Sequence, residues 1–376
     1  MSIRRSLPLA ARFMCRLPAV IVLAWATAAT ACPLCNEAAR RMVTVGQQLD
    51  AADRAVVGVP VGAGNQFRVV KVVKGNDGVG AVITDSVAGL DASAPTRCNP
   101  CLLVHNPVAP QWIALGTMRV EHADWLRQLA ATYLVRGDRP LEVWPRSVQP
   151  SSTLSEAGWR QRLVLVLPYL ENSDALVAQI AWEELARAPY ATMDMVRSRI
   201  DAKTVEGWLN DPKVVSRHAA YTLVLGFVGG PADATRLEDR METAWKSHDA
   251  TNLAAMIGAD LELRGPSRVG WVEAIYFADR ARTMPEIEAA LLALKVHGEA
   301  NRTVPRERVI KAYRAFIRER PPMAGFVAQQ LADWDHWDAT TEYTALLASG
   351  AVKDPASHLA VVNYLQRAAA AKAALR

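Results

Sequence analysis

The alternation of hydrophobic and polar residues changes character near residue 150, and this change divides the chain into two parts. Before it, short apolar runs separated by turn residues predict strands at 54–61, 66–73, 81–87, 101–104 and 111–115. The run at 66–73 is largely apolar on both faces, so we expect a sheet buried on both sides, as in a barrel or a sandwich. Helices are expected at 36–49 and 123–134.

Beyond residue 157 the apolar residues recur at helical spacing. Prolines stand at or near the start of several predicted helices, where a missing N–H costs little. Many short helices joined by short loops are typical of stacked helical pairs. The predicted helices are 158–170, 173–187, 191–200, 203–209, 212–228, 232–246, 250–263, 267–282, 285–297, 305–319, 322–333, 338–348 and 355–372.

The segment 144–157 holds two prolines and four serines and is predicted to be a linker, and Thr153-Leu154-Ser155-Glu156 offers capping for the helix that follows. We therefore expect an α+β protein. Its β-rich domain, an OB-like barrel or a sandwich, would occupy 32–143, and an all-α domain would occupy 158–376.

Part of the helical domain resembles the HEAT repeat. The segment 211–220, Asp-Pro followed by a helix with paired alanines at Ala219 and Ala220, is similar to the second half of such a repeat, and Gly229-Gly230 ends the helix. The resemblance implies a HEAT-like helical-repeat array, although no single repeat length fits the whole region.

Residues 1–31 have the pattern of a secretion signal. Four arginines and no acidic residue precede the apolar run 17–29, and Ala29-Thr30-Ala31 is an A-x-A cleavage site that leaves Cys32 as the first residue. We expect export to the periplasm or the outside of the cell. Two alternatives stay open: a lipoprotein signal that acylates Cys32, and an uncleaved anchor.

Export changes the charge of the protein. The whole chain carries +5, but removal of the four signal arginines leaves 39 basic and 38 acidic residues. A basic surface for nucleic acid is therefore not expected. No later stretch is apolar enough to cross a bilayer, so the membrane is a partner only through Cys32 or an uncleaved signal. A protein partner is expected.

Four cysteines remain after cleavage, as two CxxC pairs: Cys32 with Cys35, and Cys98 with Cys101. Export favours structural disulfides, with three possible connectivities. A zinc site of four thiolates and a redox-active pair are the alternatives. Covalent haem attachment is excluded because Asn36 and Leu102, not histidines, follow the pairs.

The densest group of metal-ligating side chains is at 333–338. Asp333, Asp335, His336 and Asp338, with two tryptophans between them, are weak candidates for a metal site. The competing interpretation is a corner between helices, with the tryptophans buried and the acids capping or solvated. No catalytic residue is assigned, and no cofactor is expected.

The front part also resembles the netrin-like module found in tissue inhibitors of metalloproteinases. The similar features are the N-terminal cysteine of the mature chain, the segments 53–59 and 67–75, and the later cysteine pair. The resemblance implies a barrel in which Cys32 and Cys35 pair with Cys98 and Cys101. The inhibitor signature is C-x-C, whereas this chain has C-x-x-C.

Most of the mature chain is similar to a group of exported bacterial proteins of planctomycete type. The resemblance implies architecture and export, and it implies no activity. The matching segments are 32–35, 182–190, 217–230, 289–298 and 331–337.

These observations predict an exported, non-catalytic binding or scaffold protein that uses its helical surface to bind another protein. Whether the chain is an enzyme is left open. The alternatives are an exported redox or metal-binding enzyme that uses the two CxxC pairs, and a metalloprotease-inhibitor-like module built on Cys32.

We expect the intact mass of the exported protein to be that of a chain beginning at Cys32, because the A-x-A site directs cleavage after Ala31. Mass spectrometry of protein recovered from the export compartment measures this. A mass raised by acyl chains would show a lipoprotein, and the mass of the full chain would show an uncleaved signal.

Overall fold

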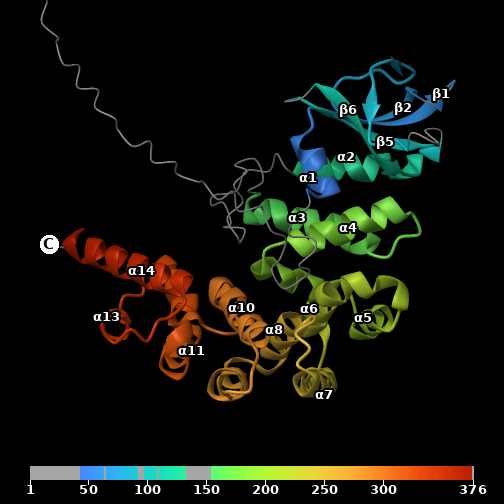
Figure 1. Ribbon diagram of the computed structural model, residues 1–376. Helices are drawn as coiled ribbons and strands as arrows, with labels where there is room; N and C mark the ends of the chain where they lie inside the picture. Colours follow the sequence, from blue (N-terminus) through green and yellow to red (C-terminus); the bar gives the residue numbers. More distant parts are fainter. Residues whose placement is uncertain (1–42, 63–64, 92–96, 108–109, 133–153, 375–376) are drawn as a thin grey trace, which may run out of the picture.

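The computed structural model describes residues 43–62, 65–91, 97–107, 110–132 and 154–374. It is an α+β protein, 65% helical, in which a curled sheet of six strands precedes many helices (Figure 1). The expected fold class is therefore confirmed. The expected signal peptide, Cys32, Cys35 and residues 144–153 of the expected linker lie outside the described residues.

The sheet is a half-barrel with the strand order β3-β2-β1-β5-β6-β4. Neighbouring strands are antiparallel except for β4 and β6, which are parallel. The segment predicted as one strand at 81–87 forms two strands of two residues each, at opposite ends of this order. The strands are β1 (Arg54–Val61), β2 (Gln66–Lys74), β3 (Val82–Ile83), β4 (Val87–Ala88), β5 (Cys101–Asn106) and β6 (Gln111–Thr117).

Both faces of the sheet are buried, as the two-sided apolar pattern predicts. Val56 of β1 belongs to a small core inside the curl, together with Phe67 and Trp112. The next residue, Val57, points to the other face and joins a larger core that includes Leu102. Successive side chains of a strand alternate between faces, so adjacent valines serve two cores.

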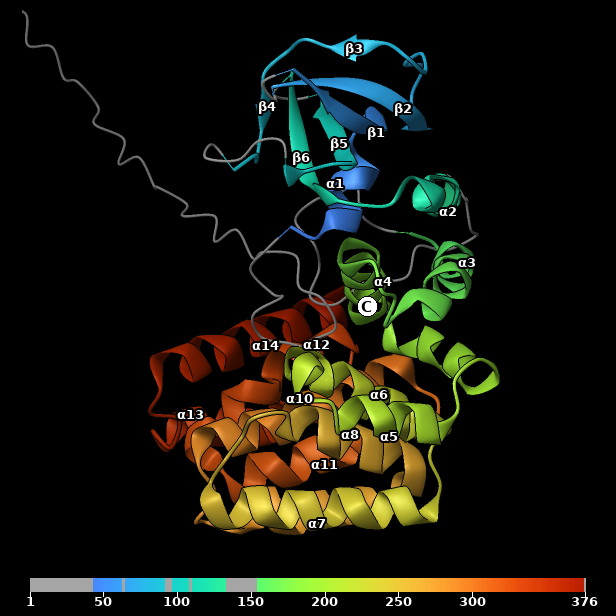
Figure 2. The same ribbon diagram turned by 90° about the vertical axis from the view of Figure 1, so that its right-hand side faces the viewer.

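Two helices cover the outer face of the sheet (Figure 2): α1 (Val45–Ala51) and α2 (Ala123–Ala131). Thr44 caps α1: its side chain accepts a hydrogen bond from Gln47 N, and the Gln47 side chain accepts one from Thr44 N. Residues 36–42 of the helix expected at 36–49 lie outside the described residues.

The helical region follows the predicted pattern closely. Its longer helices are α3 (Glu156–Val166), α4 (Ala175–Arg187), α5 (Ala202–Leu209), α6 (His218–Val228), α7 (Pro231–Ser247), α8 (Leu253–Arg264), α10 (Met284–Ala300), α11 (Arg306–Glu319), α12 (Ala328–Asp333), α13 (Thr340–Ala348) and α14 (Pro355–Ala374). None of these, nor any other helix in the described part of the chain, is long and apolar enough to span a bilayer.

Several predicted α-helices are wholly or partly of another form, and those at 212–228 and 322–333 begin as the 3-10 helices η8 (Pro212–Arg217) and η11 (Pro321–Val327). The segment at 191–200 is the 3-10 helix η7 (Tyr190–Ser198). The segment at 267–282 is short α9 (Val269–Val272) followed by a π-helical turn, η10 (Glu273–Ala278). Arg320 donates to the carbonyl oxygens of Phe277 and Asp279, so a side chain satisfies backbone acceptors where this helix ends.

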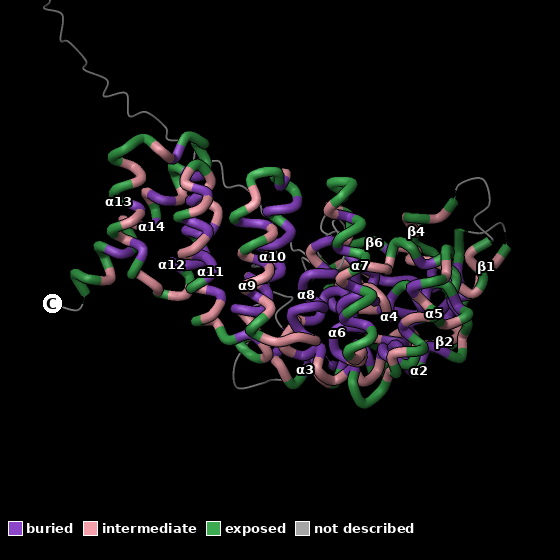
Figure 3. Tube along the Cα trace, turned by 90° about the horizontal axis from the view of Figure 1, so that it is seen from below, coloured by how far each residue is buried: buried purple, intermediate pink, exposed green. Residues whose placement is uncertain are grey.

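The helices stack in sequence (Figure 3): α5 packs beside α6, α7 beside α8 and α13 beside α14, while α6, α8, α10 and α11 pack against one another in that order. One core runs from α6 through α14, and it is buried between the helices of successive pairs. The intervals between alternate helices are unequal: α5, α7, α9, α11 and α13 start at residues 202, 231, 269, 306 and 340. This explains why no single repeat length fits the sequence.

A buried ionic cluster joins the sheet region to the array. Arg162 of α3 is fully buried, and its Nη1 donates to Asp50 Oδ1 of α1 at 3.0 Å. Its Nε forms an ion pair with Glu184 of α4, which is also fully buried. Arg187 donates to Glu184 Oε1 at 2.6 Å and to Thr44 Oγ1 at 3.3 Å. We call these four charged residues the Arg162 cluster.

Close backbone approach makes the Arg162 cluster possible. A Cβ on Gly46 would lie 1.9 Å from Glu184 Oε1, so only glycine lets α1 meet α4 here. Lys74 of β2 donates to the carbonyl oxygens of Leu49 and Asp50, which are free at the end of α1. Burial raises the pKa of Asp50, and Arg162 opposes that rise.

We predict that Arg162→Met lowers the free energy of unfolding by about 3–5 kcal/mol, because it leaves Asp50 and Glu184 buried beside a single remaining cation. Denaturant unfolding measures the loss. Arg160→Met is the matched control: Arg160 lies two residues away and pairs with Glu156 and Asp194 near the surface, so its loss should cost less than about 1 kcal/mol. Equal costs for the two variants would contradict the role given to Arg162.

Candidate functional site

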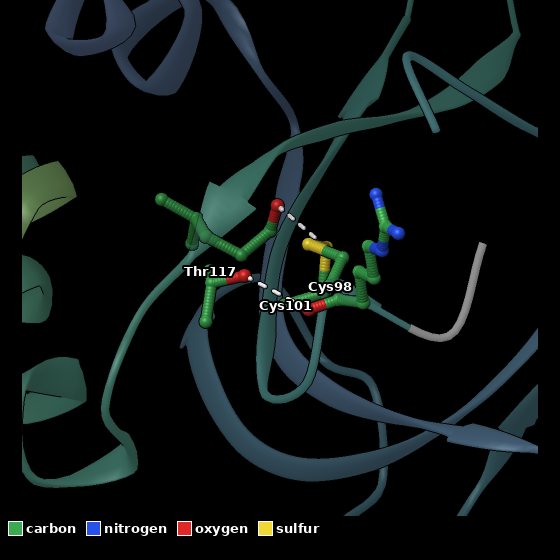
Figure 4. The surroundings of a disulfide bond; sticks show 5 residues. Cys98, Cys101 and Thr117 are labelled. Carbon is green, nitrogen blue, oxygen red and sulfur yellow. Dashed lines mark hydrogen bonds between the residues drawn. A yellow bond between two sulfur atoms is a disulfide. The ribbon is translucent and has the colours of Figure 1, made fainter. Parts of the chain in front are cut away.

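The second cysteine pair forms a disulfide within itself, between Cys98 and Cys101 (Figure 4). Cys101 is the first residue of β5 and is fully buried, whereas Cys98 is half-buried in the preceding turn. Thr117 of the neighbouring strand donates to Arg97 O beside it. The netrin-like resemblance implies that Cys98 and Cys101 pair with Cys32 and Cys35. That pairing is wrong, because Cys98 and Cys101 are bonded to each other.

The segment 333–338 ends a helix. Trp334 is the C-cap of α12, and Asp335 adopts φ 53°, the left-handed conformation that aspartate tolerates at this position. His336 N donates to Leu331 O at 2.9 Å, which satisfies a carbonyl in the last turn of the helix. The aspartates in this segment thus have a local structural cause.

The structure does not bring the four weak metal candidates together into one group of ligands. Asp333 Oδ1 accepts hydrogen bonds from Gln329 and Arg367. His336 Nε2 is 4.0 Å from Asp338 Oδ2, and Asp335 has the left-handed backbone immediately before His336. Within the described residues, no group of three or more histidines, cysteines, aspartates or glutamates is placed to hold a metal ion.

Asp335 and His336 instead line one wall of a groove of about 640 Å³. The other wall is the outer face of α11. The groove is lined by Arg306, Glu307, Ile310, Lys311, Arg314, Arg318, Trp334, Asp335 and His336, and we call it the α11 groove.

Trp334 is held rigidly at the edge of the α11 groove. Its ring is parallel to that of Tyr313, with an interplanar angle of 6° and centroids 5.8 Å apart. Its far edge packs against Gly298, where an added Cβ would lie 2.4 Å from the indole. The guanidinium of Arg306 lies 5.3 Å from the ring centroid, so the indole presents an aromatic face beside a cation.

The α11 groove has four cationic side chains and two anionic ones. Arg314 is neutralised by Glu342 of α13, at 2.6 Å, and this pairing raises the pKa of Arg314. Lys311 and Arg318 are exposed and have no ion-pair or hydrogen-bond partner among the residues that the structure describes. They are thus available to an anionic ligand.

Sequence reasoning found only one wall of the α11 groove. The segment 333–338 drew attention because it is dense in acids and aromatics. Lys311, Arg314 and Arg318 of α11 are spaced three and four residues apart, which places them on one helical face. This spacing is also typical of an ordinary solvated helix, so the sequence does not distinguish the two cases. Only the fold places these cationic side chains in the same groove as Trp334.

No family model matches this chain, and neither a curated protein nor a solved structure matches it.

We predict that reduction of the Cys98–Cys101 disulfide lowers the free energy of unfolding by about 2 kcal/mol or less and leaves the fold intact. A bond that closes so short a loop removes little entropy from the unfolded chain, compared with about 4 kcal/mol for a loop of 60 or more residues. Unfolding with and without reductant measures this. In non-reducing peptide mapping, a cross-link from the tryptic peptide that begins at Cys98 to Cys32 or Cys35 would contradict the assignment.

Proposed function

We propose that this protein is an exported, non-catalytic binding protein whose helical array holds an acidic segment of a partner protein in the α11 groove. The observation that carries the proposal is the pair of unpartnered cations, Lys311 and Arg318, in a groove edged by the fixed indole of Trp334. Charge-assisted hydrogen bonds to carboxylates are the interactions that such side chains make best.

The surrounding chain supports a protein ligand over a nucleic acid. The mature protein carries nearly equal numbers of basic and acidic residues, and the α11 groove itself includes Glu307 and Asp335. A phosphate backbone is held by an extended basic surface, which a local patch of this kind does not provide. Ile310 and Trp334 add apolar contact, which suits a peptide that carries both carboxylates and hydrophobic side chains.

The lining of the α11 groove also favours binding over catalysis. It contains no serine, threonine or cysteine that would act as a nucleophile. Its one histidine is His336. The backbone carbonyl of His336 accepts a hydrogen bond from the Tyr364 hydroxyl at 2.7 Å, which links this turn to α14. The groove therefore presents fixed contacts and lacks a nucleophile with a base beside it.

Export is part of this proposal and rests on the sequence of residues 1–31 and on the disulfide at Cys98 and Cys101. We place the protein in the periplasm or outside the cell, with Cys32 lipidation as the route by which it would be held at a membrane.

We expect Lys311→Glu with Arg318→Glu to weaken binding of an acidic peptide by about tenfold or more, because attraction to each cation becomes repulsion. The probe is a fluorescein-labelled peptide of alternating glutamate and leucine, followed by fluorescence anisotropy. Binding by the wild-type protein should weaken as salt is raised.

The matched control is Lys203→Glu with Lys213→Glu, which makes the same change in net charge at exposed lysines of α5 and the turn after it. The control should bind as the wild type does. Equal loss in both double variants would show a general charge effect and overturn the assignment to the α11 groove. Tighter binding of single-stranded DNA than of the peptide would overturn the choice of a protein partner.

A further inference from the structure

A second cavity, of about 290 Å³, lies where η7 meets the C-terminal ends of α6, α8 and α10. Phe227, Glu262 and His297 reach it from those three helices, and Tyr190 reaches it from η7. The cavity is separate from the α11 groove and shares no residue with it. We call it the Glu262 cavity.

Glu262 is buried and has one unused acceptor position. Arg197 and Thr303 donate to its Oε1, at 2.9 and 2.8 Å. Tyr190 donates to its Oε2 at 3.2 Å. A carboxylate offers about four acceptor positions, two on each oxygen. One position on Oε2 is therefore left.

His297 presents a second free acceptor beside it. Its side chain is 1% exposed, and its Nε2 lies 2.9 Å from the carbonyl oxygen of Gly258, so Nε2 carries the proton. Nδ1 is then an unprotonated acceptor, 4.0 Å from Glu262 Oε2, which is too far for a direct hydrogen bond. Burial lowers the pKa of His297, which keeps the ring neutral.

Two acceptors 4.0 Å apart can be bridged by one donor that carries at least two hydrogens. An ammonium group has three, and its charge complements Glu262. The rings of Tyr190 and Phe227, with centroids 5.1 Å apart, form aromatic walls, and the guanidinium of Arg197 already lies 5.5 Å from the Phe227 centroid.

The mouth of the Glu262 cavity is lined by hydrogen-bond donors of arginine side chains. Arg197 and Arg302 line it, with side chains 54% and 44% exposed. Arg302 is bound to Asp194 at 2.9 Å and lies 3.7 Å from Glu156, and Arg160 binds both of these carboxylates. A carboxylate on the ligand would meet guanidinium groups there.

We propose that the Glu262 cavity binds a small α-amino acid, with its ammonium group between Glu262 Oε2 and His297 Nδ1 and its carboxylate toward Arg197 and Arg302. The volume lies near the lower end of the range for small-molecule sites, which limits the ligand to a short side chain. This proposal does not depend on the function proposed for the α11 groove.

Calorimetry with L-alanine, methylamine and acetate tests each end of the ligand. L-alanine should bind tightest and methylamine more weakly, because it keeps only the ammonium contacts. Glu262→Gln should weaken L-alanine binding by about tenfold or more, since it replaces an ion pair with a neutral contact. Glu242→Gln, at an exposed position of α7, is the control and should bind as the wild type does.

A measurement on the unaltered protein guards against a variant that fails to fold. The ¹⁵N chemical shift of His297 Nδ1 should move on addition of L-alanine or methylamine, because Nδ1 becomes a hydrogen-bond acceptor, and should not move with acetate. Acetate binding as tightly as L-alanine, or no heat and no shift with L-alanine at about 10 mM, would overturn the proposal.

Discussion

Removal of the Arg162 guanidinium from water is the constraint on which the arrangement of this protein depends. A fully buried arginine is tolerated only where carboxylates meet it at hydrogen-bonding distance. Its two carboxylates come from α1, beneath the sheet, and from α4, in the helical region. The pairing therefore specifies how the two regions are oriented, while the surrounding core supplies the apolar burial. That core is continuous: it includes Val57 of the sheet and Phe227 of α6, so the front region and the first helices share their interior.

Most elements of the fold could be predicted from the sequence because their causes are local. Pro231 and Pro355 each stand at the first position of a helix, as the positions of the prolines in the sequence predict. The run 66–73, which is largely apolar on both faces, predicts a sheet that is buried on both faces. What the sequence could not predict are relations between distant segments. Arg162 reads as one more charged residue of an amphipathic helix, and Glu184 as a solvated acid, until the fold sets them together in the core.

The same limit applies to the candidate sites. The cluster at 333–338 was visible as a composition, but its role as a helix end follows from the left-handed backbone at Asp335 and the contacts of Trp334. The Glu262 cavity unites side chains from four helices and could not be assembled from spacing. Most ionisable groups in the array are used in ion pairs, such as Arg268 with Asp260 and Arg308 with Glu273. Among the groups of the described residues that have no such partner, Lys311, Arg318 and His297 Nδ1 also line a groove or a cavity beside aromatic side chains, and this combination points to ligands.

The disulfide between Cys98 and Cys101 has a consequence for when the chain becomes oxidised. The two sulfurs are separated by only three positions in sequence, so the bond needs no distant segment to be in place. It is able to form on the nascent chain as soon as that turn reaches an oxidising compartment, before the helices from α3 onward have emerged. A cross-link to the first residues of the mature chain would instead wait until the sheet had brought both ends together. If the chain is exported as proposed, early closure also removes two free thiols from exchange with other chains during assembly.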